Sequence, residues 1–418
     1  MHKITDIKAR QVFDSRGNPT VETEIYIDNK IFASAIVPSG ASRGTYEAFE
    51  LRDLENKNFL GRSVIKAIDK VNGEILKALK GFNIDDQEKI DKTLIELDGT
   101  KQKKRLGANA ILSVSLASCK ASAISKNIPL YKNLGDKKNL PVPLMNIING
   151  GMHANNSLKI QEFMIRPDSA KSFKEAINIC FLVIQNLKSI INNNKLSTSV
   201  GDEGGFTPSL SNNEEAIELI LKAIHKSGFS AGKDISICLD VAANELYKDN
   251  KYSINSSKFI SPEKTIDYYI ELIKKYPIKS IEDPFSEDDW SSWSILTEKT
   301  DNEIQIVGDD LFVTNQDRLL KGVNLKAGNA VLIKPNQIGT ITETLNVIKL
   351  AHEHKYKTII SHRSGDSEDT FIADLAVASG SNQIKSGSLT RSERVAKYNQ
   401  LLRIEEQLGK SAKMNKIH

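Results

Sequence analysis

The stretch AVLIKPN (330–336) places Lys334 directly after a short apolar run. The same phrase, a short run that ends in a charged or polar residue of catalytic type, recurs along the second half of the chain. The other runs are STSVGDEGG (197–205, with Glu203), ISICLDVAA (235–243, with Asp240), IKSIEDP (278–284, with Glu282), IQIVGDDL (304–311, with Asp309), TIISHRSG (358–365, with Arg363) and NQIKSGS (382–388, with Lys385). Stretches with helical apolar spacing, such as 212–228 and 342–355, lie between most of them. Strands that alternate with helices indicate βα units and a parallel sheet.

A polar residue at the carboxyl end of each strand favours a closed (β/α) barrel. In that fold one face of the barrel collects the residues that follow many different strands. Three carboxylates, two lysines and an arginine would then converge on one site. The pattern therefore predicts an active site at the mouth of a barrel.

The first 138 residues follow a different rhythm. Three β-favouring segments (3–15, 19–29 and 30–40) are separated by turn signals, which predicts an antiparallel meander. Helical patterns follow over 63–81, 87–99 and 109–127. Pro141 and Pro143 exclude helix and mark the best boundary. We therefore predict an α+β capping domain over 1–138 and a catalytic barrel over 139–418.

The composition is that of an ordinary soluble globular protein. The 418 residues are 39% hydrophobic and 26% charged, and 57 basic against 53 acidic residues give a formal charge of +4. The basic stretch KQKKR (101–105) has no interleaved aromatic residues, so we interpret it as a solvated face and expect no nucleic-acid partner. No window approaches the ~18 apolar residues of a membrane span. An N-terminus without an apolar signal core and three separated cysteines, Cys119, Cys180 and Cys238, predict a cytoplasmic protein with reduced core thiols.

Three acidic residues, Asp240, Glu282 and Asp309, end consecutive strand-like runs. An acidic residue at one strand end is more often a helix cap or a turn residue. Three on consecutive strands favour a Mg²⁺ site, because hard oxygen ligands can leave coordination positions open for water and substrate. Asp310 is then an ordinary cap or a supporting group.

Lys334 and Lys385 end two further runs, where a lysine is costly unless it is paired or used. Near a metal and another cation, such a lysine can have its pKa lowered enough to act as a base. Arg363 and Ser364 offer a fork of donors and a hydroxyl suited to a phosphate. His362 beside them counts among the substrate-binding candidates, although alone it could be structural.

Glycine loops supply the remaining candidates. Glu203 lies in GDEGG, where the glycines permit close backbone approach, and could be a general acid. His153 in NGGMH, and Gln161 and Glu162 in QEF, indicate a second glycine loop and a strand end that faces the same site. The loop PSGASRG (38–44) is either a mobile linker or a lid that closes over the site.

With these motifs in view, the chain resembles the enolase family along nearly its whole length. The matching phrases are DSRGNPTVE (14–22), VPSGAS (37–42), LGANAILSVSLA (106–117), PVPLMNIINGG (141–151), HANN (153–156), QEFMI (161–165), VGDEGGF (200–206), SIEDPF (280–285), VGDDLFVTN (307–315), IKPNQIGT (333–340), ISHRSG (360–365), ADLAV (373–377), QIKSGS (383–388) and RVAKYNQLLRIEE (394–406). The resemblance implies an enolase-type (β/α)8 TIM-like barrel that follows an α+β domain with a three-stranded antiparallel sheet. It also implies the reversible dehydration of 2-phosphoglycerate to phosphoenolpyruvate in glycolysis and gluconeogenesis, through a Mg-stabilised enolate.

The resemblance implies a role for each candidate. Asp240, Glu282 and Asp309 would bind the first of two Mg²⁺ ions per active site, and Ser42 would help to bind the second. Lys334 would remove the alpha proton, and Glu203, with Glu162 nearby, would protonate the departing beta hydroxyl. Arg363 and Ser364 would hold the phosphate and Lys385 the carboxylate, while Gln161 and His153 would line the pocket. A homodimer or higher homo-oligomer is implied as well.

Three positions depart from the usual family pattern: Arg43 replaces Thr in the lid, Pro335 follows the base, and Asp366 stands where Glu is common. None removes a catalytic group. The alternatives are a lyase or racemase of the same superfamily that acts on a carboxylate without phosphate, and an enolase with an added binding role. Such a role could include a secondary cell-surface or secreted pool.

Overall fold

A three-stranded antiparallel sheet opens the chain, as predicted. In the computed structural model, which describes residues 2–27, 30–40, 44–55, 57–255, 257–301 and 303–417, its strands are β1 (Ile4–Phe13), β2 (Pro19–Ile27) and β3 (Lys30–Ile36), in the order β1-β2-β3. The β1–β2 turn is closed by Asp14, whose Oδ1 accepts hydrogen bonds from the backbone N atoms of Arg16 and Asn18, each at 2.9 Å. The Asp and Gly residues of DSRGN therefore build this turn.

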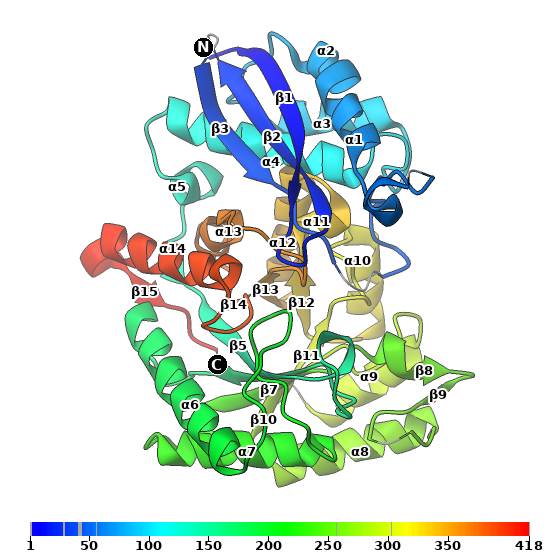
Figure 1. Ribbon diagram of the computed structural model, residues 1–418, viewed down its shortest axis with the longest axis vertical. Helices are drawn as coiled ribbons and strands as arrows, with labels where there is room; N and C mark the ends of the chain where they lie inside the picture. Colours follow the sequence, from blue (N-terminus) through cyan, green and yellow to red (C-terminus); the bar gives the residue numbers. More distant parts are fainter. Residues whose placement is uncertain are drawn as a thin grey trace.

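Helical elements follow the sheet, and those over 65–79, 87–98 and 108–125 lie at the predicted positions. The helical elements are η1 (Asn58–Gly61), α1 (Ile65–Lys70), η2 (Val71–Ile75), α2 (Leu76–Leu79), α3 (Gln87–Asp98), α4 (Ala108–Ser125) and α5 (Leu130–Leu134). Helix α4 lies between the sheet and the barrel, in contact with β2 and β3 on one side and with α11 and α12 on the other (Figure 1). Its Ala and Ser residues allow this close packing, and Thr23 Oγ1 lies 2.7 Å from Ser113 Oγ across the contact.

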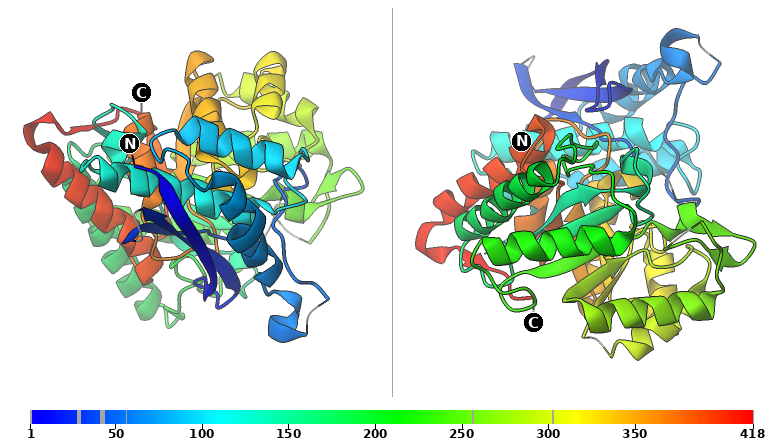
Figure 2. Two further views of the ribbon diagram at one scale, coloured as in Figure 1. Left: turned by 90° about the horizontal axis from the view of Figure 1, so that it is seen from above. Right: turned by 60° about the horizontal axis from the view of Figure 1, so that its bottom comes forward.

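Eight strands close into the predicted barrel, in the order β10-β11-β12-β13-β14-β5-β6-β7. The strands are β5 (Val142–Asn149), β6 (Glu162–Arg166), β7 (Ser236–Asp240), β10 (Ile278–Glu282), β11 (Gln305–Gly308), β12 (Ala330–Ile333), β13 (Lys357–Ser361) and β14 (Gln383–Lys385). The helices are α6 (Phe173–Asn193), α7 (Asn213–Lys226), α8 (Pro262–Lys275), α9 (Trp290–Lys299), α10 (Gln316–Leu325), α11 (Pro335–Ile338), α12 (Ile341–Glu353), α13 (Phe371–Ser379) and α14 (Ser392–Leu408). The right-hand view of Figure 2 shows the blue N-terminal sheet on one side of the barrel.

Short elements complete the chain. They are β4 (Asn139–Leu140), which pairs with β15 (Lys413–Met414), the hairpin β8 (Tyr247–Lys248) and β9 (Lys251–Tyr252), and the 3-10 turns η3 (Gly151–His153), η4 (Ala243–Leu246) and η5 (Gly409–Ser411). Among the described residues, no helix combines the length and the apolar character needed to cross a membrane. The three cysteines are buried and unbonded, as predicted.

One barrel strand breaks the parallel pattern. Strand β6 runs antiparallel to both β5 and β7, and α6 and α7 follow each other before β7 begins. The run 197–205 is therefore not a barrel strand, and the prediction that Glu203 ends a strand is wrong: it lies in the α6–α7 connection. That run has one apolar residue, Val200, among Ser, Thr and Gly, and Val200 makes only an isolated bridge with Phe206.

The reversed strand has a consequence for the site. The first residue of β6, Glu162, is paired with Asn149 at the end of β5 and with Asp240 at the end of β7. Because β6 is antiparallel, its beginning lies at the face where its neighbours end. Glu162 therefore joins the residues at the barrel mouth.

The basic stretch 101–105 is only partly solvated. Lys101 and Lys104 are exposed, but Lys103 is buried, with its Nζ 2.9 Å from Glu343 Oε1 at the start of α12. The prediction of a solvated face is wrong for Lys103, because this residue carries an ion pair between the N-terminal helices and the barrel.

Candidate active site

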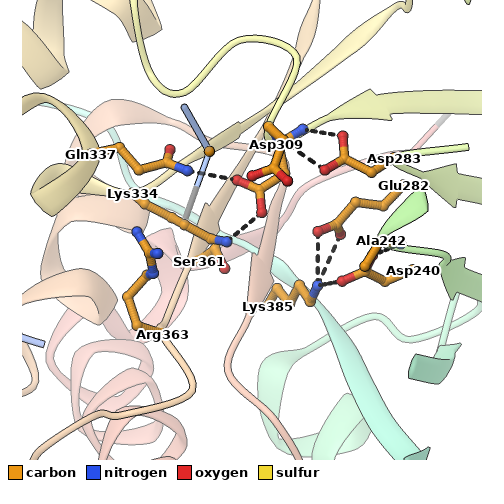
Figure 3. Close-up of polar contacts among 12 residues, drawn as sticks. Asp240, Ala242, Glu282, Asp283, Asp309, Lys334, Gln337, Ser361, Arg363 and Lys385 are labelled. Carbon is orange, nitrogen blue, oxygen red and sulfur yellow. Dashed lines mark hydrogen bonds and ion pairs between the residues drawn. The ribbon is translucent and has the colours of Figure 1, made fainter. Parts of the chain in front are cut away.

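The predicted carboxylates and lysines meet at the mouth of the barrel (Figure 3). Asp240 and Glu282 are the last residues of β7 and β10, and Asp309 directly follows β11. Lys334 directly follows β12, and Lys385 ends β14. Each strand contributes one side chain because its carboxyl end faces the same cavity. Most of these residues, together with other predicted candidates, line one pocket: His153, Gln161, Glu162, Glu203, Asp240, Asp309, Lys334, His362, Arg363, Ser364 and Lys385.

Two ammonium groups occupy the space between the carboxylates. Lys385 Nζ lies 2.8 Å from Asp240 Oδ2, 2.9 Å from Glu282 Oε1 and 3.1 Å from Glu162 Oε1. Lys334 Nζ lies 2.5 Å from Asp309 Oδ2. All three predicted metal-ligating carboxylates thus already contact a cationic atom.

Acidic groups outnumber basic ones in this buried site. Burial, and then Asp240, raise the pKa of Glu282 well above its usual value, although Lys385 opposes the shift. A buried surplus of negative charge is costly unless a cation balances it. Oxygen donors with such a surplus fit a divalent ion such as Mg²⁺.

A carboxylate that sequence reasoning missed supports the turn after β11. Asp283 follows Glu282 with a positive φ of 41°, and its Oδ1 and Oδ2 accept hydrogen bonds from the backbone N atoms of Asp309 and Asp310, both at 2.9 Å. Asp283, Asp309 and Asp310 also bring oxygen atoms within 4.8 Å of one another and could hold a metal. In the sequence, only the phrase EDP (282–284) contains Asp283, and nothing in it distinguishes this residue from a turn residue.

Asp310 has the environment of a supporting group. Its Oδ2 accepts a hydrogen bond of 2.8 Å from Asn244 Nδ2. Burial, and then the neighbouring Asp309, raise the pKa of Asp310 to about 8.

A second cluster joins two carboxyls and two histidines. His153 Nδ1 lies 3.8 Å from Glu162 Oε1 and 3.6 Å from Glu203 Oε2, and His362 Nε2 lies 3.4 Å from Glu203 Oε1. Asn146 Nδ2 donates a hydrogen bond of 3.2 Å to Glu203 Oε2. These contacts bring together the two predicted glycine loops, 150–153 and 201–205.

The two carboxyls of this cluster are held in different protonation states. Burial, and then Glu203, raise the pKa of Glu162 well above its usual value. Burial also opposes the charge of Glu203, but His153 and His362 outweigh it and lower the pKa of Glu203 well below its usual value. Neighbouring buried carboxyls with pKa values pushed apart hold one proton between them, as acid–base pairs do.

The glycines beside Glu203 have the predicted role. Gly204 has a φ of 87°, and a Cβ atom on it would lie 2.4 Å from Thr390 Oγ1. A Cβ on Gly205 would lie 2.4 Å from Asn149 Oδ1. Only glycine fits this close approach, which brings Glu203 into the pocket.

The predicted phosphate fork, Arg363, binds a carboxylate of the chain itself. Arg363 Nη1 and Nη2 donate to Glu47 Oε2 and Oε1 at 3.0 and 3.2 Å, and Gln337 Nε2 donates to Glu47 Oε1 at 3.3 Å. Glu47 Oε1 also accepts a hydrogen bond of 3.2 Å from the backbone N of Gly44. Sequence reasoning missed Glu47, because TYEAFE carries no motif. Ser42 and Arg43 lie outside the described residues.

The pKa of Lys334 is set by burial and by the adjacent Asp309. Burial opposes the charge of Lys334, but the adjacent Asp309 outweighs burial, so the pKa of Lys334 is raised rather than lowered. The backbone of Lys334 is extended, at φ −128° and ψ 106°, and Pro335 starts α11. A proline disfavours the helical region for the residue before it, and the extended backbone of Lys334 agrees with this effect of Pro335.

Comparison with known proteins decides the family. Residues 4–134 match the N-terminal domain of enolase, and residues 137–418 match its C-terminal TIM barrel domain. An enolase from Pelagibacter ubique (strain HTCC1062) is 66% identical over 420 residues, which cover 100% of both chains. The chain belongs to the enolase family. Enolase is phosphopyruvate hydratase, the glycolytic enzyme that dehydrates 2-phosphoglycerate to phosphoenolpyruvate, and this is the reaction of the chain.

Proposed function

We propose that Lys334 and Glu203 divide the reversible dehydration of 2-phosphoglycerate between them, Lys334 as the base and Glu203 as the acid. The observation that carries this proposal is their separate placement. Lys334 pairs with Asp309, whereas Glu203 pairs with His153 and His362. One side of the pocket thus holds a cationic group beside carboxylates, and the other holds a carboxyl beside two imidazoles.

Lys334 removes the alpha proton of 2-phosphoglycerate. Its ammonium can give up a proton only when Asp309 is engaged with another cation, because this carboxylate stabilises the charged lysine. Lys385 and Arg363 then lower its pKa further through like-charge repulsion. The base therefore becomes active once the site is loaded.

Glu203 protonates the beta hydroxyl, which leaves as water. In the free site the proton of this pair lies on Glu162, whose pKa is raised, so Glu203 must receive that proton before it can act as the acid. His153 and His362 stabilise the carboxylate that remains on Glu203. Glu162 is the second member of this acid pair.

The metal part of the proposal is two Mg²⁺ ions per active site. Asp240, Glu282 and Asp309 would hold the first, and Ser42 would help to hold the second. Asp283 positions the turn instead, because both its oxygens accept backbone hydrogens. When bound, the ions would neutralise the charge that grows on the substrate carboxylate.

The remaining residues bind and orient the substrate. Arg363 and Ser364 hold the phosphate, and Lys385 holds the carboxylate. His153, Gln161 and His362 line the pocket; Oε1 of Gln161 is buried without a hydrogen-bond partner among the described residues, which suits a substrate hydroxyl. Family resemblance further supports at least a homodimer, a cytoplasmic location and a domain boundary between residues 138 and 139.

A direct assay tests the proposal. The protein is mixed with 2-phosphoglycerate and Mg²⁺, and the absorbance of the enol phosphate is followed with and without a chelator. We expect absorbance that rises with Mg²⁺, stops with chelator and is lost in Lys334→Ala. Alpha-hydrogen exchange on a non-phosphorylated 2-hydroxy acid, without reaction of 2-phosphoglycerate, would instead favour the other members of the superfamily.

A further inference from the structure

A buried arginine behind the acid cluster has no role in the mechanism described so far. Arg394 lies in the first turn of α14 (red in Figure 1) and is 0% exposed. Its Nη1 lies 2.7 Å from His362 Nδ1, and His362 Nε2 in turn lies 3.4 Å from Glu203 Oε1. Arg394, His362 and Glu203 therefore form a chain that ends at the proposed acid.

Arginine is an obligate donor, and this decides the tautomer of the histidine. The guanidinium has N–H donors and no acceptor, so Nδ1 of His362 must accept. A neutral His362 then carries its hydrogen on Nε2, the atom that faces Glu203. Burial lowers the pKa of His362 to about 4, which keeps the ring neutral.

The same guanidinium holds the two segments that must be aligned. Nη2 donates to the carbonyl oxygen of Asp202, the residue before Glu203, at 3.1 Å. It also donates to Ser364 O at 2.7 Å, and Nη1 donates to Arg363 O at 2.6 Å. The acid loop and the proposed phosphate segment are thus attached to one buried cation.

We propose that Arg394 is a positioning residue that fixes His362 as the Nε2–H tautomer, so that this hydrogen is directed at Glu203. This inference rests on the proposed role of Glu203. When Glu203 gives its proton to the beta hydroxyl and water leaves, a carboxylate remains. The Nε2 atom of His362 lies 3.4 Å from Glu203 Oε1 and has no hydrogen-bond partner among the described residues, so its hydrogen is free to be donated to that carboxylate. The opposite tautomer would present a lone pair and oppose proton transfer.

The tautomer can be observed without any substrate. Protein labelled with ¹⁵N-histidine is examined by long-range ¹H–¹⁵N NMR, and the His362 signals are assigned by their loss in His362→Gln. We expect the Nε2–H pattern in the wild-type protein and a mixture of tautomers in Arg394→Ala. An Nδ1–H pattern in the wild-type protein would overturn the proposal.

Kinetics separate positioning from simple loss of stability. Arg394→Ala should lower dehydration by at least about 10²-fold while alpha-hydrogen exchange, the work of Lys334, falls much less. Added guanidinium ion should restore part of the dehydration. Arg166→Lys is the matched control. Arg166 is also buried and pairs with Asp168, but it lies beside Ser236 at the beginning of β7, at the end of the barrel opposite the site. The substitution should therefore shift thermal stability without changing the ratio of the two rates.

The Arg394 and Glu203 variants test two separate points: the positioning role of Arg394 and the role of Glu203 as the acid. Equal loss of both rates in folded Arg394→Ala, without rescue, would overturn the positioning role. If Arg394→Ala does not fold, the positioning role is tested by the ratio of the two rates in Arg394→Lys and by the His362 tautomer in the wild-type protein. Full dehydration by Glu203→Gln would remove Glu203 as the acid but leave the tautomer measurement standing.

Discussion

Lys334 Nζ lies 2.5 Å from Asp309 Oδ2, so the proposed base and a proposed metal ligand share one ion pair. Lys334→Ala should therefore abolish proton abstraction and still leave the carboxylates able to bind Mg²⁺. Loss of a general base typically costs ~10²- to 10⁴-fold in rate. The measurement is solvent exchange of the alpha hydrogen, followed by NMR beside the dehydration rate.

A lysine elsewhere in the barrel provides the control. Lys357 begins β13, is half-buried, and its Nζ donates to the backbone oxygen of Ile417. Lys357→Ala should leave both rates near the wild-type values. Normal exchange in Lys334→Ala would show that another residue is the base.

Glu203→Gln should separate the two halves of the reaction. The amide cannot supply the proton for the beta hydroxyl, so dehydration should fall by at least ~10²-fold. Alpha-hydrogen exchange should survive in part, because Lys334 is intact. Both rates are measured on one sample, and an equal loss of the two would count against the division of roles.

Much of this site was predictable from sequence because its residues follow strand ends. A short run with apolar residues predicts the strand, and a parallel barrel brings its last residue or the next one to the mouth. Asp240, Glu282, Asp309, Lys334 and Lys385 were all located in this way. Their family roles were implied by resemblance alone.

The parts that sequence reasoning missed depend on tertiary contacts. The direction of β6 is set by its pairing with β5 and β7. The five residues EFMIR predict a strand, but they carry no pattern that distinguishes parallel from antiparallel pairing. Glu47 reaches Arg363 across 316 positions of sequence, and Arg394 reaches His362 across 32. No local pattern records such contacts, and the charge balance that raises the pKa of Lys334 appears only when Asp309 is placed beside it.

A buried carboxyl outside the site should make stability depend on pH. Asp374 accepts hydrogen bonds from the backbone N of Tyr131 at 3.2 Å and from Gln400 Nε2 at 3.1 Å. Burial raises the pKa of Asp374 to about 6. The folded state favours the protonated carboxyl. The contribution of Asp374 to the stability of the folded protein is therefore complete below the unfolded pKa of about 3.9, and it is lost as the pH rises through 6.

Asp374→Asn should remove this dependence. Between pH 4 and pH 7.5 the free energy of unfolding of the wild-type protein should fall relative to that of the variant by on the order of 2–3 kcal/mol. The thermal midpoint of the wild-type protein should fall with it. Thermal unfolding of both proteins across this range is the measurement. Parallel curves for the two proteins would mean that Asp374 does not titrate in this window.

Glu47→Gln should make anion binding by Arg363 easier. A phosphate must displace the Glu47 carboxylate from the guanidinium, and a neutral amide is a weaker competitor. Inorganic phosphate should bind about tenfold more tightly, which corresponds to ~1.4 kcal/mol. Calorimetry measures the affinity, and Glu50→Gln serves as control because Glu50 pairs with Arg52. Unchanged or weaker binding by Glu47→Gln would argue that Glu47 orients Arg363 rather than competing for it.

The two proposed Mg²⁺ sites should respond to different substitutions. Asp309→Asn removes one negative charge from the first site, so the affinity of the free protein for Mg²⁺ should fall and excess Mg²⁺ should restore part of the activity. Ser42→Ala, in the lid segment outside the described residues, should leave that affinity nearly unchanged while turnover falls. The reason is that the second ion binds only with substrate.

Calorimetric titration of Mg²⁺ with and without substrate separates these cases. Glu287→Gln is a matched control near the lid: Glu287 accepts a hydrogen bond of 3.1 Å from the backbone N of Thr45 but is not one of the proposed ligands. It should leave first-site affinity intact. If Ser42→Ala weakens the first site as strongly as Asp309→Asn does, the lid belongs to the inner site and the two-site arrangement is wrong. Arg43 adds a cation next to Ser42, so the loss of turnover in Ser42→Ala should become larger when Arg43 is also changed to Thr.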